Sequence, residues 1–412
     1  MKTLLSFMIF LVASTFQLFP QWNKLPVATD SDLMNLFFLT ENIGWVVGND
    51  ATILKTTDGG ITWIAQQPNI YLDFRSIYFV NEKTGWAGGS DGKFIKTTNG
   101  GENWNLLESP TDYSISSLVF IDEEHGYAAV NSMKRGRYGC VLETIDGGNV
   151  WCKSFETSGQ LLIDVKFLDH NNGWVVGSNG HIVFTTNGGL NWEKQKTNTG
   201  HWLFSVFSLD GYKIWATGGG EDQDMILFSK DGGCSWRILR NSESNGRLTG
   251  SYFINNEIGW VCGKDGVILK TENGGYNWQN QISQSNYDLR KIIFSGNIGY
   301  AVGQRGTILK YHYLENEKRL EILSPNGNEE LITGTFSELI WRSEGVVDVK
   351  IEYSYNNGAS WNLVTASYPS SGIYKWKVPN IISNQTRIRI YDRQRADIFD
   401  ENDDNFKIIN PK

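Results

Sequence analysis

The stretch Asp73-Phe-Arg-Ser-Ile-Tyr-Phe-Val-Asn-Glu-Lys-Thr-Gly-Trp-Ala-Gly-Gly89, continued by Lys93-Phe-Ile-Lys-Thr-Thr-Asn-Gly-Gly-Glu-Asn-Trp104, decides the fold of this chain. Apolar and aromatic runs alternate in it with short groups of Asn, Asp and Gly, the residues that tight turns prefer. The pattern predicts four short antiparallel strands within residues 73–107. The first run is apolar on both faces, which indicates a strand that is covered on both sides.

The same pattern recurs along the chain. In each unit a phenylalanine is followed about seven residues later by an aromatic residue, usually between two glycines. A period of about 40–50 residues with several strands per unit is typical of a β-propeller, because one small sheet buries its faces only against copies of itself. We therefore predict an all-β fold with a seven-bladed propeller over residues 21–313. The aromatic residues are Trp45, Trp86, Tyr127, Trp174, Trp215, Trp260 and Tyr300, spaced 41, 41, 47, 41, 45 and 40 residues apart.

A second motif, Thr-x-Asp/Asn-Gly-Gly-x-x-Trp, closes six of the units, with Ser229 in place of Thr in one; we call it the turn box. Its Asx side chain can accept hydrogen bonds from the turn's own amides, its glycines allow positive φ, and its Trp covers the hairpin. Because the Asx position alternates between Asp and Asn, a structural role is expected and a catalytic or metal-binding one is not. The Asx and Trp residues are Asp58 and Trp63, Asn99 and Trp104, Asp146 and Trp151, Asn187 and Trp192, Asp231 and Trp236, and Asn273 and Trp278.

These boxes resemble the Asp-box, or BNR repeat, of sialidases, sortilin-type receptors and photosystem II assembly factors. The resemblance covers about residues 22–312 and implies the propeller fold rather than an activity. The number of units and the Gly-Trp-x-x-Gly motif are most similar to the photosystem II assembly factors. In that family an arginine-bearing face meets a membrane-protein precursor, so the resemblance implies a non-catalytic assembly role.

The N-terminal segment is expected to complete the last blade. The last unit ends without a box Trp, whereas Trp22 lies 41 residues before Trp63, the spacing that also separates Trp63 from Trp104. We therefore expect residues 21–27 to pair with residues 307–311, which leaves no open edge strand in the ring.

The N-terminus and the charge indicate where the protein acts. Residues 1–20 have a charged start and an apolar run from Leu4 to Phe19, which predicts a signal peptide and a secreted or periplasmic protein; an uncleaved anchor is the alternative. We expect no transmembrane span in the mature chain, and a monomer. The net charge of −8 disfavours nucleic acid and anionic membranes as partners.

A second domain is predicted after a charged linker at residues 314–319. Residues 320–412 alternate with period two and carry turn signals about every ten residues, which predicts a small β-sandwich. The pattern resembles an immunoglobulin- or fibronectin-like domain related to the Ser-Thr-rich cell-wall family. A further turn box runs from Ser354 to Trp361. We interpret the acidic run from Asp400 to Asp404 as a solvated loop, with a calcium site as the alternative.

The cysteines and histidines show no pattern typical of a metal site. Cys140 and Cys152 flank one predicted hairpin, so a cross-strand disulfide between them is a hypothesis. We expect Cys262 to be a buried thiol and Cys234 to lie in a peripheral turn. We predict no metal site and no cofactor, because no ligand spacing is seen among His125, His170, His181, His201 and His312.

The candidate binding surface is the mouth of the central channel. Loops from the fourth strand of one blade to the first strand of the next end there, and aromatic residues combined with arginines are typical of protein interfaces. The alternative is that the rings pack between blades and that the arginines pair with Asp73 and Asp288. The predicted partner is a protein or a surface glycan. The candidate residues are Tyr71, Asp73, Arg75, Tyr113, His201, Trp202, Arg247, Tyr287 and Arg290.

A carbohydrate-active enzyme is the main alternative function, and purely architectural use at the cell surface is a third. Sialidases with similar boxes carry an Arg-Ile-Pro motif, which none of the eight prolines here provides. Asp73, Asp164 and Asp288 are acid/base candidates, but nothing in the sequence shows that they converge. We therefore predict an exported, non-catalytic recognition or assembly scaffold.

Deletion of residues 21–28 tests the predicted closure. The truncated protein should melt at a sharply lower temperature, because the last blade would lose its outer strand and its only box-like Trp. Thermal unfolding followed by circular dichroism measures this, and a truncated protein that melts like the full chain would show the closure to be wrong.

Overall fold

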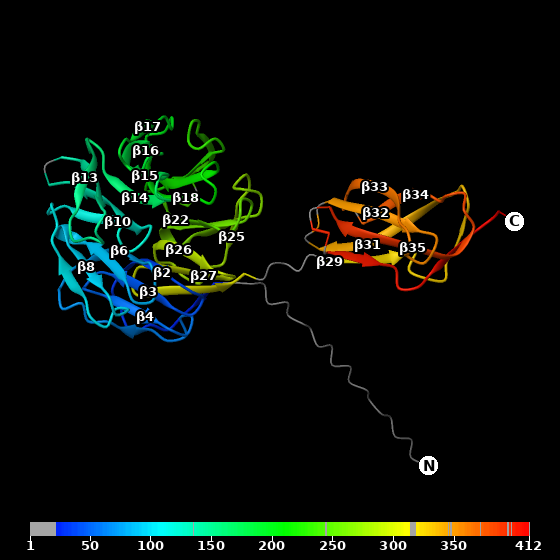
Figure 1. Ribbon diagram of the computed structural model, residues 1–412, viewed down its shortest axis with the longest axis horizontal. Helices are drawn as coiled ribbons and strands as arrows, with labels where there is room; N and C mark the ends of the chain where they lie inside the picture. Colours follow the sequence, from blue (N-terminus) through cyan, green and yellow to red (C-terminus); the bar gives the residue numbers. More distant parts are fainter. Residues whose placement is uncertain are drawn as a thin grey trace, which may run out of the picture. The chain divides into compact units, whose positions relative to one another are not determined.

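The computed structural model describes residues 22–134, 136–243, 245–313, 319–344, 346, 348–370, 372–393, 395–396 and 398–411. The chain divides into two compact units, Met1–Tyr313 and Leu314–Lys412. Both are built from β-strands (Figure 1), and the helical elements of the described ranges are the 3-10 turns η1 (Ser90–Gly92), η2 (Ser178–Gly180) and η3 (Lys264–Gly266). The predicted signal peptide and residues 314–318 of the predicted linker lie outside the described residues, and Arg319 already begins a strand.

The described part of the first unit forms seven four-stranded antiparallel sheets. Six of them follow the chain order, and one takes its outer strand from the N-terminus. The sheets are β2 (Leu33–Phe38), β3 (Gly44–Gly48), β4 (Ile53–Thr56), β5 (Ile64–Ala65); β6 (Phe74–Phe79), β7 (Gly85–Gly89), β8 (Phe94–Thr97), β9 (Asn105–Leu107); β10 (Ser114–Phe120), β11 (Gly126–Ser132), β12 (Tyr138–Thr144), β13 (Cys152–Ser158); β14 (Leu162–Phe167), β15 (Gly173–Gly177), β16 (Ile182–Thr185), β17 (Glu193–Gln195); β18 (Trp202–Ser208), β19 (Ile214–Gly219), β20 (Asp224–Ser229), β21 (Arg237–Ser242); β22 (Leu248–Phe253), β23 (Gly259–Gly263), β24 (Ile268–Thr271), β25 (Gln279–Gln281); and β26 (Leu289–Ser295), β27 (Ile298–Gly303), β28 (Thr307–His312), β1 (Asn23–Lys24).

The two ends of this unit pair with each other. In β1, Asn23 lies opposite Lys310 and Lys24 opposite Leu309 of β28, so the predicted strand pairing is present. Trp22 is fully buried and stacks on Tyr311, with ring centroids 5.0 Å apart. The first strands β2, β6, β10, β14, β18, β22 and β26 each contact the next, and β26 contacts β2. In Figure 1 the yellow β27 accordingly lies beside the blue β2 and β3. The sheets therefore stack around a central channel, as in a β-propeller.

Close packing explains both glycines of the Gly-Trp-x-x-Gly motif. A Cβ on Gly85 would lie 2.5 Å from the ring of Phe79 on the adjacent strand, and a Cβ on Gly89 would lie 2.0 Å from the carbonyl oxygen of Asp73. The Phe79 ring also stacks on Trp45 of the preceding sheet, with centroids 3.6 Å apart and planes 9° apart. Six of the seven repeat phenylalanines are thus held between a glycine of their own sheet and an aromatic ring of the neighbouring one; the exception is Phe207, where Ile214 takes the place of the glycine.

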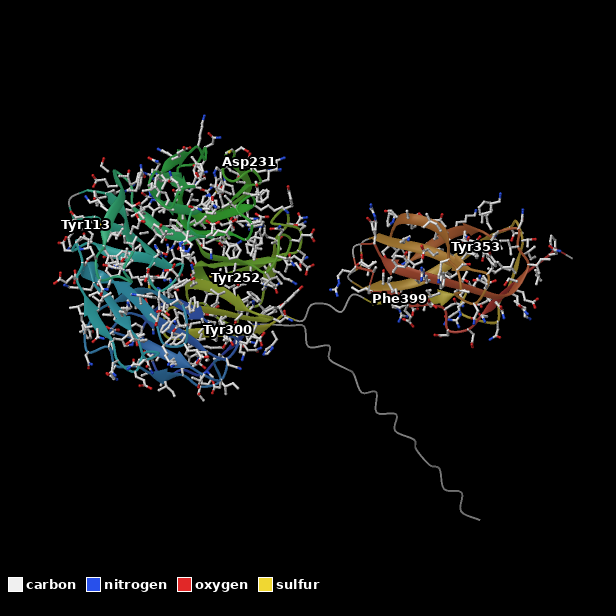
Figure 2. The ribbon with its side chains drawn as sticks, viewed as in Figure 1. Tyr113, Asp231, Tyr252, Tyr300, Tyr353 and Phe399 are labelled. Atoms are coloured by element: carbon white, nitrogen blue, oxygen red, sulfur yellow. The ribbon has the colours of Figure 1, made fainter. Side chains whose placement is uncertain are left out.

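The turn boxes share one hydrogen-bond pattern. In the first box the Thr56 hydroxyl donates to Asp58 Oδ1 at 2.8 Å and accepts the N–H of Gly60 at 2.8 Å, while Asp58 Oδ1 accepts the N–H of Thr62 at 2.9 Å. The box carbonyl also accepts from the adjacent sheet: Trp86 Nε1 donates to Gly147 O at 2.9 Å. The corresponding bond joins the last sheet to the first, where Tyr300 (labelled in Figure 2) donates its hydroxyl to Gly59 O at 2.8 Å.

The second unit contains two sheets around one apolar core, in which Trp341, Trp376 and Phe406 are buried. Ser354 and Asn356 repeat the box hydrogen bonds in the turn between β32 (Asp348–Ser354) and β33 (Asn362–Pro369). Asp400, in the acidic run, accepts the N–H of Ile322 at 2.7 Å. One sheet is β29 (Arg319–Ser324), β31 (Phe336–Glu344) and β34 (Ile373–Lys377); the other is β30 (Glu330–Ile332), β37 (Phe406–Ile409), β35 (Ser383–Asp392), β32 (Asp348–Ser354) and β33 (Asn362–Pro369), with β36 (Phe399–Glu401) paired to β35.

The disulfide hypothesis is wrong. Cys140 and Cys152 lie on the neighbouring strands β12 and β13, but both thiols are free. Cys152 stands opposite Glu143, three residues from Cys140, and side chains an odd number of residues apart on a strand point to opposite faces. Cys140 is accordingly buried, whereas Cys152 is exposed.

Substitution Gly85→Ala tests the packing of the repeated motif. The added methyl group would press on the Phe79 ring, so the free energy of unfolding should fall by about 1–3 kcal/mol. Gly200→Ala is the matched control, because a Cβ there meets nothing within 4 Å. Urea unfolding followed by tryptophan fluorescence measures both, and equal stability of the two variants would contradict the packing.

Candidate functional site

Every first strand carries a β-bulge near its start. In β6 the bulge falls between Phe74 and Ser76, so Arg75 is an inserted residue without a partner on β7. A bulge bends the strand and redirects the inserted side chain. All seven inserted residues line one cavity of about 370 Å³, which we call the mouth cavity. They are Met34, Arg75, Ser116, Ile163, Phe204, Thr249 and Arg290.

Four of the nine candidate binding residues meet at the mouth cavity. Arg75, Trp202, Arg247 and Arg290 all line it, together with the buried carboxylate of Asp164 and the ammonium of Lys291. The sequence predicted nine residues at this face, of which these four line the cavity; it contained no signal for the bulges, so the other inserted residues, Met34, Ser116, Ile163, Phe204 and Thr249, were missed.

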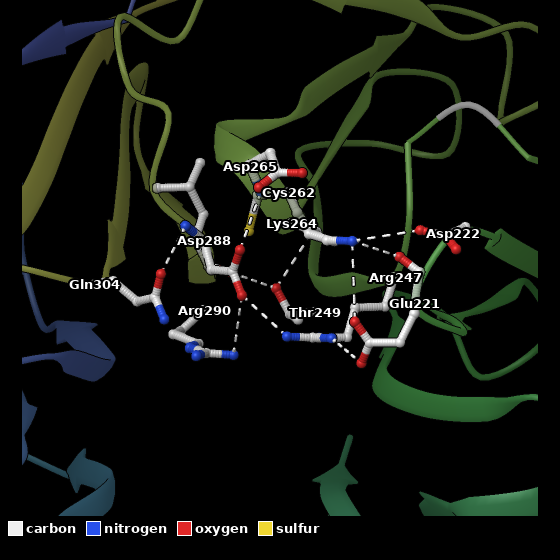
Figure 3. Close-up of polar contacts among 11 residues, drawn as sticks. Glu221, Asp222, Arg247, Thr249, Cys262, Lys264, Asp265, Asp288, Arg290 and Gln304 are labelled. Carbon is white, nitrogen blue, oxygen red and sulfur yellow. Dashed lines mark hydrogen bonds and ion pairs between the residues drawn. The ribbon is translucent and has the colours of Figure 1, made fainter.

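Arg247 and Asp288 form the centre of an ion-pair network at this site (Figure 3). Arg247 donates Nη2 to Asp288 Oδ2 at 3.0 Å and Nη1 to Glu221 Oε1 at 2.8 Å. Asp288 also accepts the N–H of Asp265 at 3.1 Å. Both side chains of the central pair are mostly buried, with 22% and 13% exposure. For Arg247, the alternative to a binding role is therefore correct: this arginine pairs with Asp288 within the protein.

Arg75 and Arg290 are less fully engaged. Arg290 Nη1 lies 3.8 Å from Asp288 Oδ2, and its buried Nε has no hydrogen-bond acceptor among the described residues. Arg75 is exposed and forms no ion pair with the described residues. Asp73, which was the expected partner, accepts the backbone N–H of Asp50 instead. Two arginines that line the mouth cavity are thus incompletely paired among the described residues.

The other candidate residues have structural partners outside the mouth cavity. The Tyr71 hydroxyl donates to Asp50 at 2.9 Å, and this bond raises the pKa of Tyr71. Tyr113 packs edge-on against Tyr138. His201 O accepts the N–H of Gly180 at 2.6 Å. Arg305 lies over the ring of Tyr287, 5.6 Å from its centroid.

A second cavity of about 260 Å³ continues along the channel and shares Asp164 and Lys291 with the first. Asp164 accepts the Ser117 hydroxyl at 2.8 Å and the N–H of Val206 at 3.1 Å. Burial lowers the pKa of the neighbouring Lys166, and the charge of Lys291 lowers it further. Both oxygens of Asp164 are occupied by contacts with the protein, so this acid/base candidate serves the scaffold.

One group of side chains with metal-ligating atoms occurs among the described residues: Asp122, His125 and His170, on the face where the turn boxes lie. The sequence gave no ligand spacing because the two histidines come from turns of neighbouring sheets. Alignment of the repeats would have provided the signal, since Asp122 is the second residue after Phe120 and His170 the third after Phe167. No helix within the described ranges has the length and apolarity of a membrane span.

Comparison with known proteins places the first unit near one family. A family model described as Photosynthesis system II assembly factor YCF48 matches residues 15–111 and 155–251. The photosystem II assembly lipoprotein Ycf48 of Synechocystis sp. is 44% identical over 46 residues, which are 11% of this chain and 14% of that protein. The first unit is a BNR-like β-propeller that resembles this assembly factor.

Solved structures agree on the fold. A structure of YCF48 bound to D1 peptide has a TM-score of 0.60 at 21% identity and covers 71% of this chain and 96% of that one. YCF48 from Cyanidioschyzon merolae has a TM-score of 0.59 at 21% identity and covers 71% and 99%. The GH74 xyloglucanase from Xanthomonas campestris has a TM-score of 0.57 at 10% identity and covers 93% and 81%. At these identities the likeness shows the fold alone.

Substitution Asp288→Asn tests the ion-pair network. Loss of the carboxylate charge leaves Arg247 and Arg290 without their shared anion, so the free energy of unfolding should fall by about 1–3 kcal/mol. Asp222→Asn is the control: Asp222 lies 3.5 Å from Lys264 but is 93% exposed, and its loss should change stability by less than about 0.5 kcal/mol. Urea unfolding of both variants measures the difference, and equal effects would contradict a central role for Asp288.

Proposed function

We propose that this protein is an exported, non-catalytic assembly or recognition scaffold that binds an extended segment of another protein at the mouth cavity. The observation that carries the proposal is the presence of two incompletely paired arginines, Arg75 and Arg290, beside Trp202 in one cavity. Guanidinium groups with free donors bind carboxylates and backbone carbonyls, and a neighbouring Trp adds apolar contact area.

The resemblance to the assembly factor supports a protein as the partner. The YCF48 structure with a similar fold was solved with a peptide, D1, bound to it. We extend to this chain only the class of ligand, a peptide segment, because the identity of 21% does not carry individual contacts across. The positive groups at the cavity favour a segment with acidic side chains or a free C-terminal carboxylate.

The architecture that we propose for this role is a seven-bladed propeller closed by β1, spanning residues 21–313, and an immunoglobulin- or fibronectin-like sandwich at residues 320–412. Seven four-stranded sheets in the described residues support the first part, and the three- and six-stranded sheets support the second. A signal peptide at residues 1–20 would deliver the protein to the periplasm or the cell surface.

A carbohydrate-active enzyme is the second candidate, favoured by the fold likeness to a xyloglucanase. The carboxylates of Asp73, Asp164 and Asp288 all have partners within the protein, which argues against their use as a general acid and base. Turnover of fluorogenic glycosides by the purified protein would favour this candidate over the scaffold.

A peptide-display selection on the purified protein tests the scaffold proposal. We expect it to enrich acidic peptides, and a synthetic copy of an enriched peptide should bind with an affinity that falls as salt rises. Arg75→Ala should weaken binding at least tenfold, because interface arginines are frequent energetic hot spots and Arg75 has no ion-pair partner among the described residues to lose.

Arg237→Ala is the matched control, since Arg237 is exposed on the outer strand β21, away from the mouth cavity. It should leave the dissociation constant, measured by fluorescence polarisation, unchanged. Selection of no peptide, or equal binding by the wild-type protein and Arg75→Ala, would refute the proposed site.

A further inference from the structure

Two neighbouring hairpin turns bring three ligating side chains together on the face where the turn boxes lie. The first turn joins β10 to β11 and contains Asp122 and His125; the second joins β14 to β15 and contains His170. Asp122 Oδ2 lies 2.9 Å from His125 Nδ1 and 3.5 Å from His170 Nε2. One ligating atom from each residue lies within 4.8 Å of the other two.

The corresponding turns in other sheets do not combine these residue types. In five of the other six, one side-chain oxygen at the start of the turn accepts two backbone N–H groups; the acceptors are Thr40, Asn81, Asp169, Asp210 and Asn255. Asp122 does this with Oδ1, which accepts the N–H groups of Glu124 and His125 at 2.8 and 2.7 Å. An amide would suffice for that task, and the second oxygen of Asp122 is left to face the two imidazoles.

The surroundings favour a cation. The Asp122 carboxylate stands beside both imidazoles, and Asp169 precedes His170 in the second turn. The side chains of Asp122, His125 and His170 are 41%, 39% and 57% exposed, so an ion and a water ligand can reach them.

We propose that Asp122, His125 and His170 bind a divalent transition-metal ion of the Zn²⁺ class and thereby link the third and fourth sheets. Two imidazoles and one carboxylate are a ligand set for zinc, whereas Ca²⁺ and Mg²⁺ prefer oxygen ligands. A tetrahedral zinc with bonds of about 2.1 Å holds its ligands roughly 3.4 Å apart, a spacing that these exposed side chains reach with small rotations. Three protein ligands leave one coordination position for water or a partner group.

On binding, His125 takes the tautomer that carries its proton on Nε2, so that Nδ1 offers its electron pair and the metal replaces the hydrogen bond between Nδ1 and Asp122; a ring that starts as imidazolium also releases one proton to solvent. Imidazole nitrogens and the carboxylate oxygen then donate electron pairs to the ion, and no oxidant or reductant is needed. The site lies on the opposite end of the sheets from the bulges that form the mouth cavity, so it is independent of the proposed peptide site.

Isothermal titration of the tag-free, chelator-treated protein with ZnCl₂ at pH 7.5 tests the proposal. We expect one Zn²⁺ per chain with a dissociation constant in the micromolar range or tighter, a higher melting temperature with Zn²⁺, and no saturable binding of Ca²⁺. His170→Ala should raise the dissociation constant at least tenfold, because it removes one of three ligands. Asp122→Asn, which keeps the turn-capping oxygen, should do the same.

His201→Ala and His312→Ala are the matched controls, since both histidines lie away from the cluster, and neither should change the affinity for Zn²⁺. Co²⁺ provides an independent readout: the wild-type protein should give the visible absorption of low-coordinate Co²⁺, and His170→Ala should not. Absence of saturable Zn²⁺ binding, or binding that survives in His170→Ala, would overturn the proposal and leave the three side chains as a hydrogen-bonded tie between sheets.

Discussion

Stacking of aromatic rings between neighbouring sheets is the interaction on which this propeller depends. Phe79 lies on Trp45, Phe120 on Trp86 and Phe167 on Tyr127, with centroids 3.6–3.7 Å apart and planes within 9° of parallel. A glycine must stand behind each phenylalanine, because a side chain there would occupy the space of the ring. A four-stranded sheet of this size is barely stable alone, so every sheet draws its stability from its two neighbours. The ring has no free end, because Tyr300 stacks on Phe38 at 4.0 Å.

The closed ring of sheets brings the β-bulges of the seven first strands together around the mouth cavity. One bulge per first strand directs one extra side chain into the mouth cavity, so residues far apart in the chain meet there without any loop having to fold over them. Ser116 and Thr249 donate from this position to the backbone of the next sheet, whereas Arg75 forms no ion pair with the described residues. Arg75 and Arg290 are the side chains that we propose for recognition, while Arg247 is held by Asp288 and Glu221 in the wall beside them.

The repeat in the sequence predicted the all-β fold, the strand pairing of the N-terminus and the grouping of three arginines, because all three follow from periodicity. Trp22 is an example: its spacing from Trp63, together with the missing box Trp of the last unit, placed it beside the last sheet, where it meets Phe294 edge-on with ring centroids 6.1 Å apart. Features that depend on register were not predictable. Cys140 and Cys152 do not face each other, because a β-bulge and an odd number of residues in the strand register separate them. Asp122 and His170 meet only because the two turns that contain them, in adjacent sheets, lie side by side.

A double-mutant cycle on Phe38 and Tyr300 tests the central claim most directly. These residues belong to the first and last sheets along the chain, and their rings are stacked only if the ring is closed. With leucine at either position and at both, urea unfolding should give a coupling energy of about 0.5–1.5 kcal/mol, as expected for a stacked aromatic pair. A coupling energy indistinguishable from zero would contradict the account.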